Sequence, residues 1–236
     1  MNDSPHPATS GSGVPSERVP VVHAVTDDLI LTRPTFAERA LDVMQALGAR
    51  GAVHLRARII PSRRLLSLAE ALRLAQQETG CWLIINDRID LALAVGARGV
   101  QLTSRSIRVA DGRRIAPNMK LGASVHTVDQ AHHADRDGAD WLVAGHVFDT
   151  SSHAGVPGRG VPFLRAVCAA SSLPVLAIGG VTPALTTEVR RTGAHGVAVI
   201  RGIWSARDAE RAARDYLSAY DADGSRAASD RRDSEW

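Results

Sequence analysis

The chain contains few aromatic residues and few cysteines. Phe, Trp and Tyr make up 4% of its 236 residues, so Ala, Val, Leu and Gly must fill the interior, which suits a layered α/β core. The two cysteines, Cys81 and Cys168, lie far apart in the sequence and form no C-x-x-C pair. This disfavours a disulfide or a cysteine metal site, and both residues are expected to be reduced thiols.

Long apolar runs and basic tracts are also lacking. No apolar stretch reaches the roughly 18 to 20 residues of a membrane helix, and the first residues lack the apolar core of a signal peptide. The net charge is +3, but the arginines are scattered among nearly as many acids and no basic run is interleaved with aromatics. We therefore expect a soluble, cytoplasmic protein whose partner is a small molecule, with no nucleic acid and no membrane. Whether it forms a homo-oligomer is left open.

What the sequence does contain is a regular alternation of short aliphatic runs and amphipathic stretches. About eight such units predict a single α/β domain, a (β/α)₈ TIM barrel spanning residues 19–221. The tails 1–18 and 222–236 are rich in Ser, Gly, Pro and charge, and are predicted to be disordered. A Rossmann-like sheet is disfavoured because no glycine follows the first strand. The predicted strands cover residues 19–26, 52–56, 81–85, 99–102, 120–124, 140–145, 174–180 and 195–200.

Glycines follow the last two predicted strands. Gly179 and Gly180 end the seventh strand and Gly202 follows the eighth, where backbone N–H groups could approach a phosphate and Arg201 could add charge. The alternative is that these glycines only permit tight turns and that Arg201 points into solvent. Their occurrence after both strands favours the phosphate site.

Cationic and amide side chains follow the second and third strands. Arg56, Arg58 and Asn86 should converge on one barrel mouth and predict an anionic substrate. Asp87 is expected to cap the next helix, and Arg88 to pair with surface acids. His54 should point away from its neighbours on the strand and is assigned a structural role. His126, His132 and His133 lie on or beside a helix and are expected to face solvent or cap it.

The segment 145–160 after the sixth strand is long, polar and rich in glycine, which is typical of a functional loop. Its first histidine, His146, could transfer protons near neutral pH, but its spacing alone slightly favours a hydrogen-bonded histidine at a strand end. After the fourth strand the residues Ser104 and Ser106 offer no carboxylate, so Asp87 is the one obvious candidate for a metal ligand. No metal site is predicted.

Taken in order, the strings HAVTDD, VHLRAR, INDRIDLAL, GVQL, GASVHT, GHVFDT, GRG, AIGGVTP and GVAVIRGI resemble the thiamine-phosphate synthase/TenI superfamily. The resemblance runs from about residue 21 to residue 203. It implies a TIM barrel and a role in thiamine metabolism. Two activities occur in the superfamily: a synthase that joins a pyrimidine diphosphate to thiazole phosphate, and a TenI-type tautomerase that aromatizes a thiazole carboxylate phosphate.

Departures from the synthase pattern favour the second activity. Ser106 stands where synthases carry their second Mg²⁺ carboxylate, and Arg58 and His153 replace lysines that bind the diphosphate. The strings G-H-V-F-[DE]-T and G-x-G-R-G resemble the TenI type. By this resemblance the chain is expected to be a thiazole tautomerase in which His146 moves the proton and no metal or organic cofactor is needed.

The expected ligand is a phosphorylated thiazole. Its phosphate is expected to contact Gly179, Gly180, Arg201 and Gly202. The rest of the substrate is expected to contact Arg56, Arg58, Asn86, Ser124 and Thr150. Two alternatives remain: a thiamine-phosphate synthase with rearranged diphosphate contacts, and a non-catalytic phosphometabolite-binding or regulatory barrel.

Overall fold

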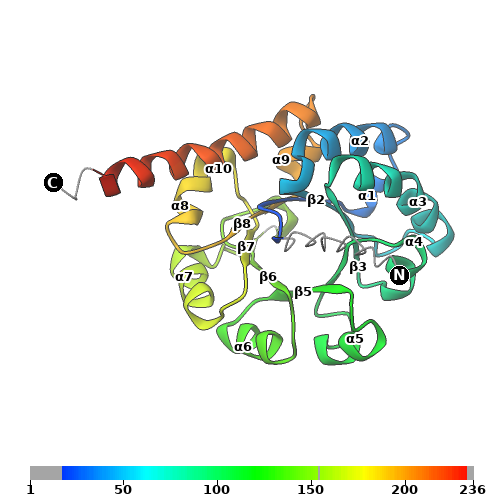
Figure 1. The fold of residues 1–236 in the computed structure, drawn as a ribbon, viewed down its shortest axis with the longest axis horizontal. Helices are drawn as coiled ribbons and strands as arrows, with labels where there is room; N and C mark the ends of the chain where they lie inside the picture. Colours follow the sequence, from blue (N-terminus) through cyan, green and yellow to red (C-terminus); the bar gives the residue numbers. More distant parts are fainter. Residues whose placement is uncertain (1–17, 154, 233–236) are drawn as a thin grey trace, which may run out of the picture.

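The computed structural model describes residues 18–153 and 155–232, and in it the chain forms a closed barrel of eight parallel strands (Figure 1). The strands follow one another around the barrel in sequence order, and β1 closes it by pairing with β8. The TIM-barrel prediction is thereby confirmed. The strands are β1 (Val22–Val25), β2 (Gly51–Leu55), β3 (Trp82–Asn86), β4 (Gly99–Leu102), β5 (Lys120–Val125), β6 (Trp141–Gly145), β7 (Val175–Ile178) and β8 (Gly196–Val199).

Helices connect the strands and surround the barrel (Figure 1). Each long helix carries a buried apolar face, as the sequence periodicity predicts. The helices are α1 (Asp28–Leu31), α2 (Phe36–Leu47), α3 (Ser62–Thr79), α4 (Ile89–Val95), α5 (Val109–Ile115), α6 (Val128–Arg136), α7 (Gly160–Ala170), α8 (Thr186–Arg190), α9 (Arg201–Trp204) and α10 (Ala209–Arg232), with 3₁₀ turns η1 (Gly48–Arg50), η2 (Ser151–His153) and η3 (Pro183–Leu185).

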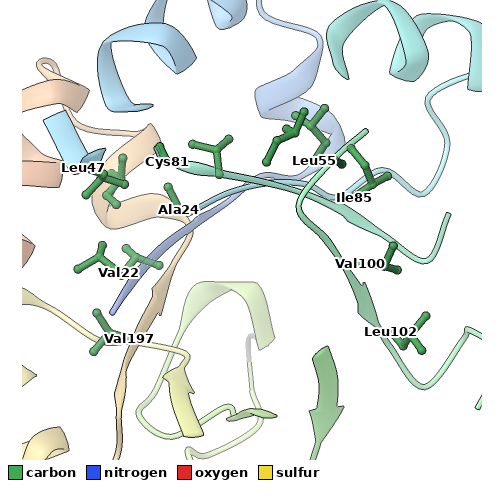
Figure 2. Close-up of a cluster of buried hydrophobic side chains, with 14 of the residues drawn as sticks. Val22, Ala24, Leu47, Leu55, Cys81, Ile85, Val100, Leu102 and Val197 are labelled. Carbon is green, nitrogen blue, oxygen red and sulfur yellow. The ribbon is translucent and has the colours of Figure 1, made fainter. Parts of the chain in front are cut away.

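Side chains on each strand alternate between two apolar layers. One layer lies between the strands and the helices, and Figure 2 shows part of it, with Leu55 and Ile85 on the side of their strands that faces the helices. The other layer fills the barrel interior and includes Trp82 and Trp141. Gly122 makes room for the Trp141 indole, because a Cβ at this position would overlap the ring.

This alternation decides which polar residues reach the mouth of the barrel. On β2, Ala52 belongs to the interior layer, so His54 and Arg56, two and four residues later, face inward as well. On β3, the interior residue Ile84 places Asn86 inward at the end of the strand. The inward residues at the carboxyl ends of β2 and β3 are therefore polar and reach the mouth of the barrel.

The limits of the barrel domain stay predictions. The first 17 residues, predicted to be disordered, lie outside the described part of the chain. At the other end α10 packs against α2 and α8, then continues as a helix to Arg232, past position 222 where a disordered tail is predicted to begin. Both cysteines are free thiols, with Cys81 buried. Among the described helices, none is long and apolar enough to cross a membrane.

Candidate active site

A cavity of about 660 Å³ opens at the carboxyl ends of the barrel strands. This is the end at which TIM barrels place their chemistry, because the βα loops converge there. The structure brings all ten predicted site residues to this one cavity, from six different strand ends, although their individual roles stay predictions. The ten are Arg56, Arg58, Asn86, Ser124, His146, Thr150, Gly179, Gly180, Arg201 and Gly202.

Four guanidinium groups line the cavity: those of Arg56, Arg58, Arg105 and Arg201. Over residues 18–153 and 155–232, none of the four forms a salt bridge or a side-chain hydrogen bond. Burial lowers the pKa of Arg56, and the neighbouring charge of Arg58 lowers it further. A guanidinium stays protonated regardless, so four cations against the two lining carboxylates of Asp87 and Asp149 leave the cavity positively charged, and an anion would neutralise that charge.

The turn after β7 is built for close backbone approach. Gly179 and Gly180 have φ of +99° and +66°, a region that residues with a side chain adopt at a cost. A Cβ at Gly180 would lie 2.5 Å from the Asp149 carbonyl oxygen, and one at Gly179 would overlap His146. The turn therefore needs both glycines for its own packing, and the same geometry leaves its backbone facing the cavity.

His146 begins the long loop after β6 and is 8% exposed. Its Nε2 lies 3.2 Å from the carbonyl oxygen of Val156, ten residues later, so the ring donates to the far side of its own loop. Asp149 braces the same loop by accepting a 2.7 Å hydrogen bond from the Gly158 amide. These two bonds join the start of the loop, residues 146–149, to its end, residues 156–158.

Asp87 differs from its predicted role. It does not cap α4, which begins after Arg88 without a side-chain cap. Its backbone lies in the left-handed region, with φ of +61°, and both carboxylate oxygens accept from Thr103. Such a backbone costs about 1 kcal/mol or more, and the two bonds hold it in place. Arg88 pairs with Asp90 on the surface, as predicted.

Several cavity residues were missed by sequence reasoning. His54 is not an isolated structural histidine, since it lines the cavity and contacts Asn86. His126 does not face solvent: its Nδ1 lies 2.7 Å from the Gly145 carbonyl oxygen at the cavity wall. Arg105 also lines the cavity. Counting by two along β2 from an apolar interior residue could have found His54, whereas the loop residues Arg105 and His126 carried no such signal.

A magnesium ion would need oxygen ligands, usually from one or two carboxylates. Two carboxylates line the cavity, but Asp87 is engaged by Thr103 and Asp149 by Gly158. Ser106 replaces the expected second carboxylate and is not among the lining residues. Within the described ranges, no group of three or more His, Cys, Asp or Glu residues could hold a metal ion. The residues therefore do not fit a site in which the protein itself holds Mg²⁺.

Sequence comparison adds a family to this geometry. The family model for thiamine monophosphate synthase matches residues 22–203. The chain belongs to this family. Thiamine-phosphate synthases of Methanoculleus marisnigri and Roseiflexus castenholzii are 39% and 40% identical to it, over 86% and 89% of this chain and 98% and 90% of theirs.

Comparison with solved structures points to the same family. Thiamine phosphate pyrophosphorylase from Pyrococcus furiosus superposes with a TM-score of 0.76 at 32% identity, covering 85% of this chain and 95% of that one. A 3-hexulose-6-phosphate synthase at 16% identity, with a TM-score of 0.63, shares the fold alone.

These relatives correct the expected activity. Relatives 33–40% identical are named thiamine-phosphate synthase, which matches the alternative rather than the tautomerase. The prediction of a thiazole tautomerase was therefore wrong. It weighted short loop motifs and three replaced ligands above the rest of the chain, whereas the likeness to synthases extends over most of its length.

Proposed function

We propose that the protein is a thiamine-phosphate synthase. In this reaction the thiazole nitrogen attacks the methylene carbon of hydroxymethylpyrimidine diphosphate, a C–N bond forms, the C–O bond to the diphosphate breaks, and inorganic pyrophosphate leaves. The nitrogen lone pair becomes the new bond and the ring carries the positive charge. No proton has to be removed from the nucleophile, so the protein's task is to orient two phosphorylated molecules and to stabilise a departing anion.

The observation that carries the proposal is the set of four cavity arginines without carboxylate partners. Arg56 and Arg58 follow β2 and Arg105 follows β4, whereas Arg201 follows β8. Because β4 and β8 lie across the barrel from each other, Arg105 and Arg201 offer anion-binding groups on opposite sides of the cavity, and Arg56 and Arg58 lie between them after β2. Two phosphorylated substrates whose reacting rings must meet between their phosphate groups need such an arrangement.

We assign the diphosphate to Arg56, Arg58 and Arg105. Since the residues do not fit a magnesium site held by two carboxylates, the charge of the leaving group falls on these guanidinium groups. Arginine suits this task because its planar fork forms paired hydrogen bonds with phosphate oxygens. Burial and the charge of Arg58 lower the pKa of Arg56. A bound anion would raise this pKa again, because it offsets the repulsion between the two guanidinium groups.

We assign the thiazole phosphate to the wall made by Gly179, Gly180, Arg201 and Gly202. Backbone N–H groups at glycine turns and helix starts bind phosphate oxygens without a side chain in the way. Asn86, Ser124 and Thr150 would contact the reacting rings between the two walls. In this scheme His146 is a positioning residue that holds the loop through Val156.

The test is direct. Purified protein is incubated with hydroxymethylpyrimidine diphosphate and thiazole phosphate, with and without added Mg²⁺, and thiamine phosphate and pyrophosphate are quantified by chromatography. Formation of both products in equal amounts supports the synthase. Binding of both substrates by calorimetry without any product would contradict it and would indicate a non-catalytic phosphometabolite-binding barrel.

A further inference from the structure

A series of hydrogen bonds runs through the barrel interior from Pro20, at the amino end of the strands, to the cavity at their carboxyl ends. His23 Nε2 lies 3.0 Å from the Pro20 carbonyl oxygen, and His23 Nδ1 lies 2.7 Å from His54 Nε2. His54 Nδ1 lies 3.2 Å from the side-chain oxygen of Asn86, which lines the cavity. Both imidazoles have 0% exposure, so the series is shielded from water at every step except the last.

The protons in this series can be counted from the Pro20 end. A carbonyl oxygen accepts and cannot donate, so the proton of the first bond sits on His23 Nε2. A neutral His23 then has a bare Nδ1, which must accept from His54 Nε2–H. A neutral His54 in turn has a bare Nδ1, which needs a donor opposite it.

The side-chain oxygen of Asn86 cannot be that donor, but its NH₂ group can. The oxygen and nitrogen of an amide have nearly the same shape, and their places are decided by the hydrogen-bond network. A half-turn of the amide puts the NH₂ group against His54 Nδ1 and turns the carbonyl oxygen towards the cavity. The other solution is one extra proton on the pair, and burial opposes it: burial lowers the pKa of His54 to about 4 and that of His23 well below its usual value.

We infer that His23 and His54, each protonated at Nε2, fix the Asn86 amide with its oxygen facing the cavity, so that Asn86 selects a substrate ring bearing an N–H donor. His23 and His54 are positioning residues, and Asn86 is the group that contacts the substrate. The inference rests on the proposed function for the identity of the ring, an aminopyrimidine, but the orientation of the amide follows from the hydrogen bonds alone.

Neighbouring residues complete a hydrogen-bond pattern. The indole N–H of Trp141, a donor with no acceptor capacity, lies 2.8 Å from Gln101 Oε1 and so fixes that amide. Gln101 Nε2 therefore donates to Ser124 Oγ at 3.1 Å, which leaves the Ser124 hydroxyl proton available. The cavity lining thus presents an acceptor at Asn86, on β3, and a donor at Ser124, on β5. An exocyclic amine next to a ring nitrogen presents the matching donor and acceptor.

Tautomers in the ligand-free protein provide the first test. Long-range ¹H–¹⁵N spectra of ¹⁵N-histidine-labelled protein at pH 7 distinguish protonated from bare ring nitrogens, and single His→Gln variants assign the two buried rings. We expect His23 and His54 both to be neutral and protonated at Nε2. A proton on His54 Nδ1, whether in the neutral or the charged ring, would overturn the inference.

Ligand discrimination provides the second test. Calorimetry compares the monophosphate of 4-amino-5-hydroxymethyl-2-methylpyrimidine with the analogue that carries hydrogen in place of the amine. A site built to bond an N–H group rejects a ligand that lacks it, so we expect wild-type protein to prefer the amine by about tenfold or more. His54→Leu, which cannot accept from Asn86, should lower this preference several-fold. His54→Gln can both donate to His23 and accept from Asn86, so it should retain the preference.

These outcomes separate the inference from the proposed function. Equal binding of the two pyrimidine phosphates by wild-type protein overturns the inference even if thiamine phosphate is formed. Preference for the amine, with both rings protonated at Nε2, supports the inference even if no thiamine phosphate is formed and the synthase proposal fails. Equal preference in His54→Leu and His54→Gln would show that the histidine pair does not control the amide.

Discussion

Thr103 donates twice to Asp87, from its amide nitrogen at 2.8 Å and from its hydroxyl at 3.0 Å. The two residues follow neighbouring strands, β3 and β4, and the pair joins their loops at the cavity rim. Asp87 also donates its own amide to the Gln101 carbonyl oxygen at 3.0 Å. The strained backbone of Asp87 is therefore held by three hydrogen bonds to the β4 end.

Replacing Thr103 by valine keeps the shape and removes the hydroxyl, which donates to Asp87 and accepts from the Arg105 amide at 3.3 Å. We expect Thr103→Val to lower the free energy of unfolding by about 1 to 3 kcal/mol, because the bond is made to a charged carboxylate. Urea denaturation at pH 7 measures the change. Thr103→Ser retains the hydroxyl and is the matched control. If valine and serine destabilise the protein equally, the hydroxyl bond does not hold Asp87.

Arg58 tests the assignment of the diphosphate wall. Its side chain is exposed and makes no ion pair with the described residues, so Arg58→Gln should leave the free energy of unfolding nearly unchanged. Binding of inorganic pyrophosphate, measured by calorimetry, should weaken by about tenfold, since one charge-assisted bond contributes roughly 1.5 kcal/mol or more. Arg73→Gln, an equally exposed change on α3 away from the cavity, should bind normally. Unchanged affinity in the Arg58 variant would argue against this wall.

Strand order and cavity location could be predicted from the sequence because both follow from local patterns. Aliphatic runs at regular spacing define buried parallel strands, and in a barrel the strand ends converge. The glycine pair 179–180 and Arg56 were found in this way. Each depends on position relative to one strand, which the sequence displays directly.

Contacts between strands could not be predicted in the same way. His23 and His54 are 31 residues apart, and their meeting depends on the register of β1 against β2. The pairing of Asp87 with Thr103 depends on the register of β3 against β4. The activity was mispredicted for a related reason. The replacement of single ligands, such as a carboxylate by Ser106, was taken to exclude the synthase reaction, because the sequence does not show which arginines the barrel brings to the cavity.

Tyr216 connects α10 to the predicted phosphate wall. Its buried hydroxyl donates to the Val181 carbonyl oxygen at 2.9 Å, one residue after the glycine turn, and burial raises its pKa to about 12. Tyr216→Phe leaves that carbonyl unpaired, so we expect a loss of about 1 to 3 kcal/mol in the free energy of unfolding. The KM for thiazole phosphate should rise while the KM for the pyrimidine diphosphate stays unchanged. Tyr220→Phe, on the same helix, is the control, and equal changes in both KM values would contradict a local role.

Stability should depend on pH through the buried histidine pair. An unfolded histidine titrates near 6.5, whereas burial lowers the pKa of folded His54 to about 4. As the pH falls below 6.5 the unfolded chain takes up the proton first, so stability conferred by the neutral ring is complete above 6.5 and is lost progressively down to about pH 4. For His54 alone the loss is about 3 kcal/mol.

A variant isolates this contribution. Urea denaturation of wild type and His54→Gln is compared at pH 7 and pH 4.5, and the free energy of unfolding should fall by roughly 2 to 3 kcal/mol less in the variant, because glutamine does not titrate. His132→Gln, an exposed change on α6, should follow the wild type. If His54→Gln loses as much stability as the wild type, His54 is already charged in the folded protein at pH 4.5. A charged ring donates from Nδ1, so the side-chain oxygen of Asn86 would then face His54 and not the cavity.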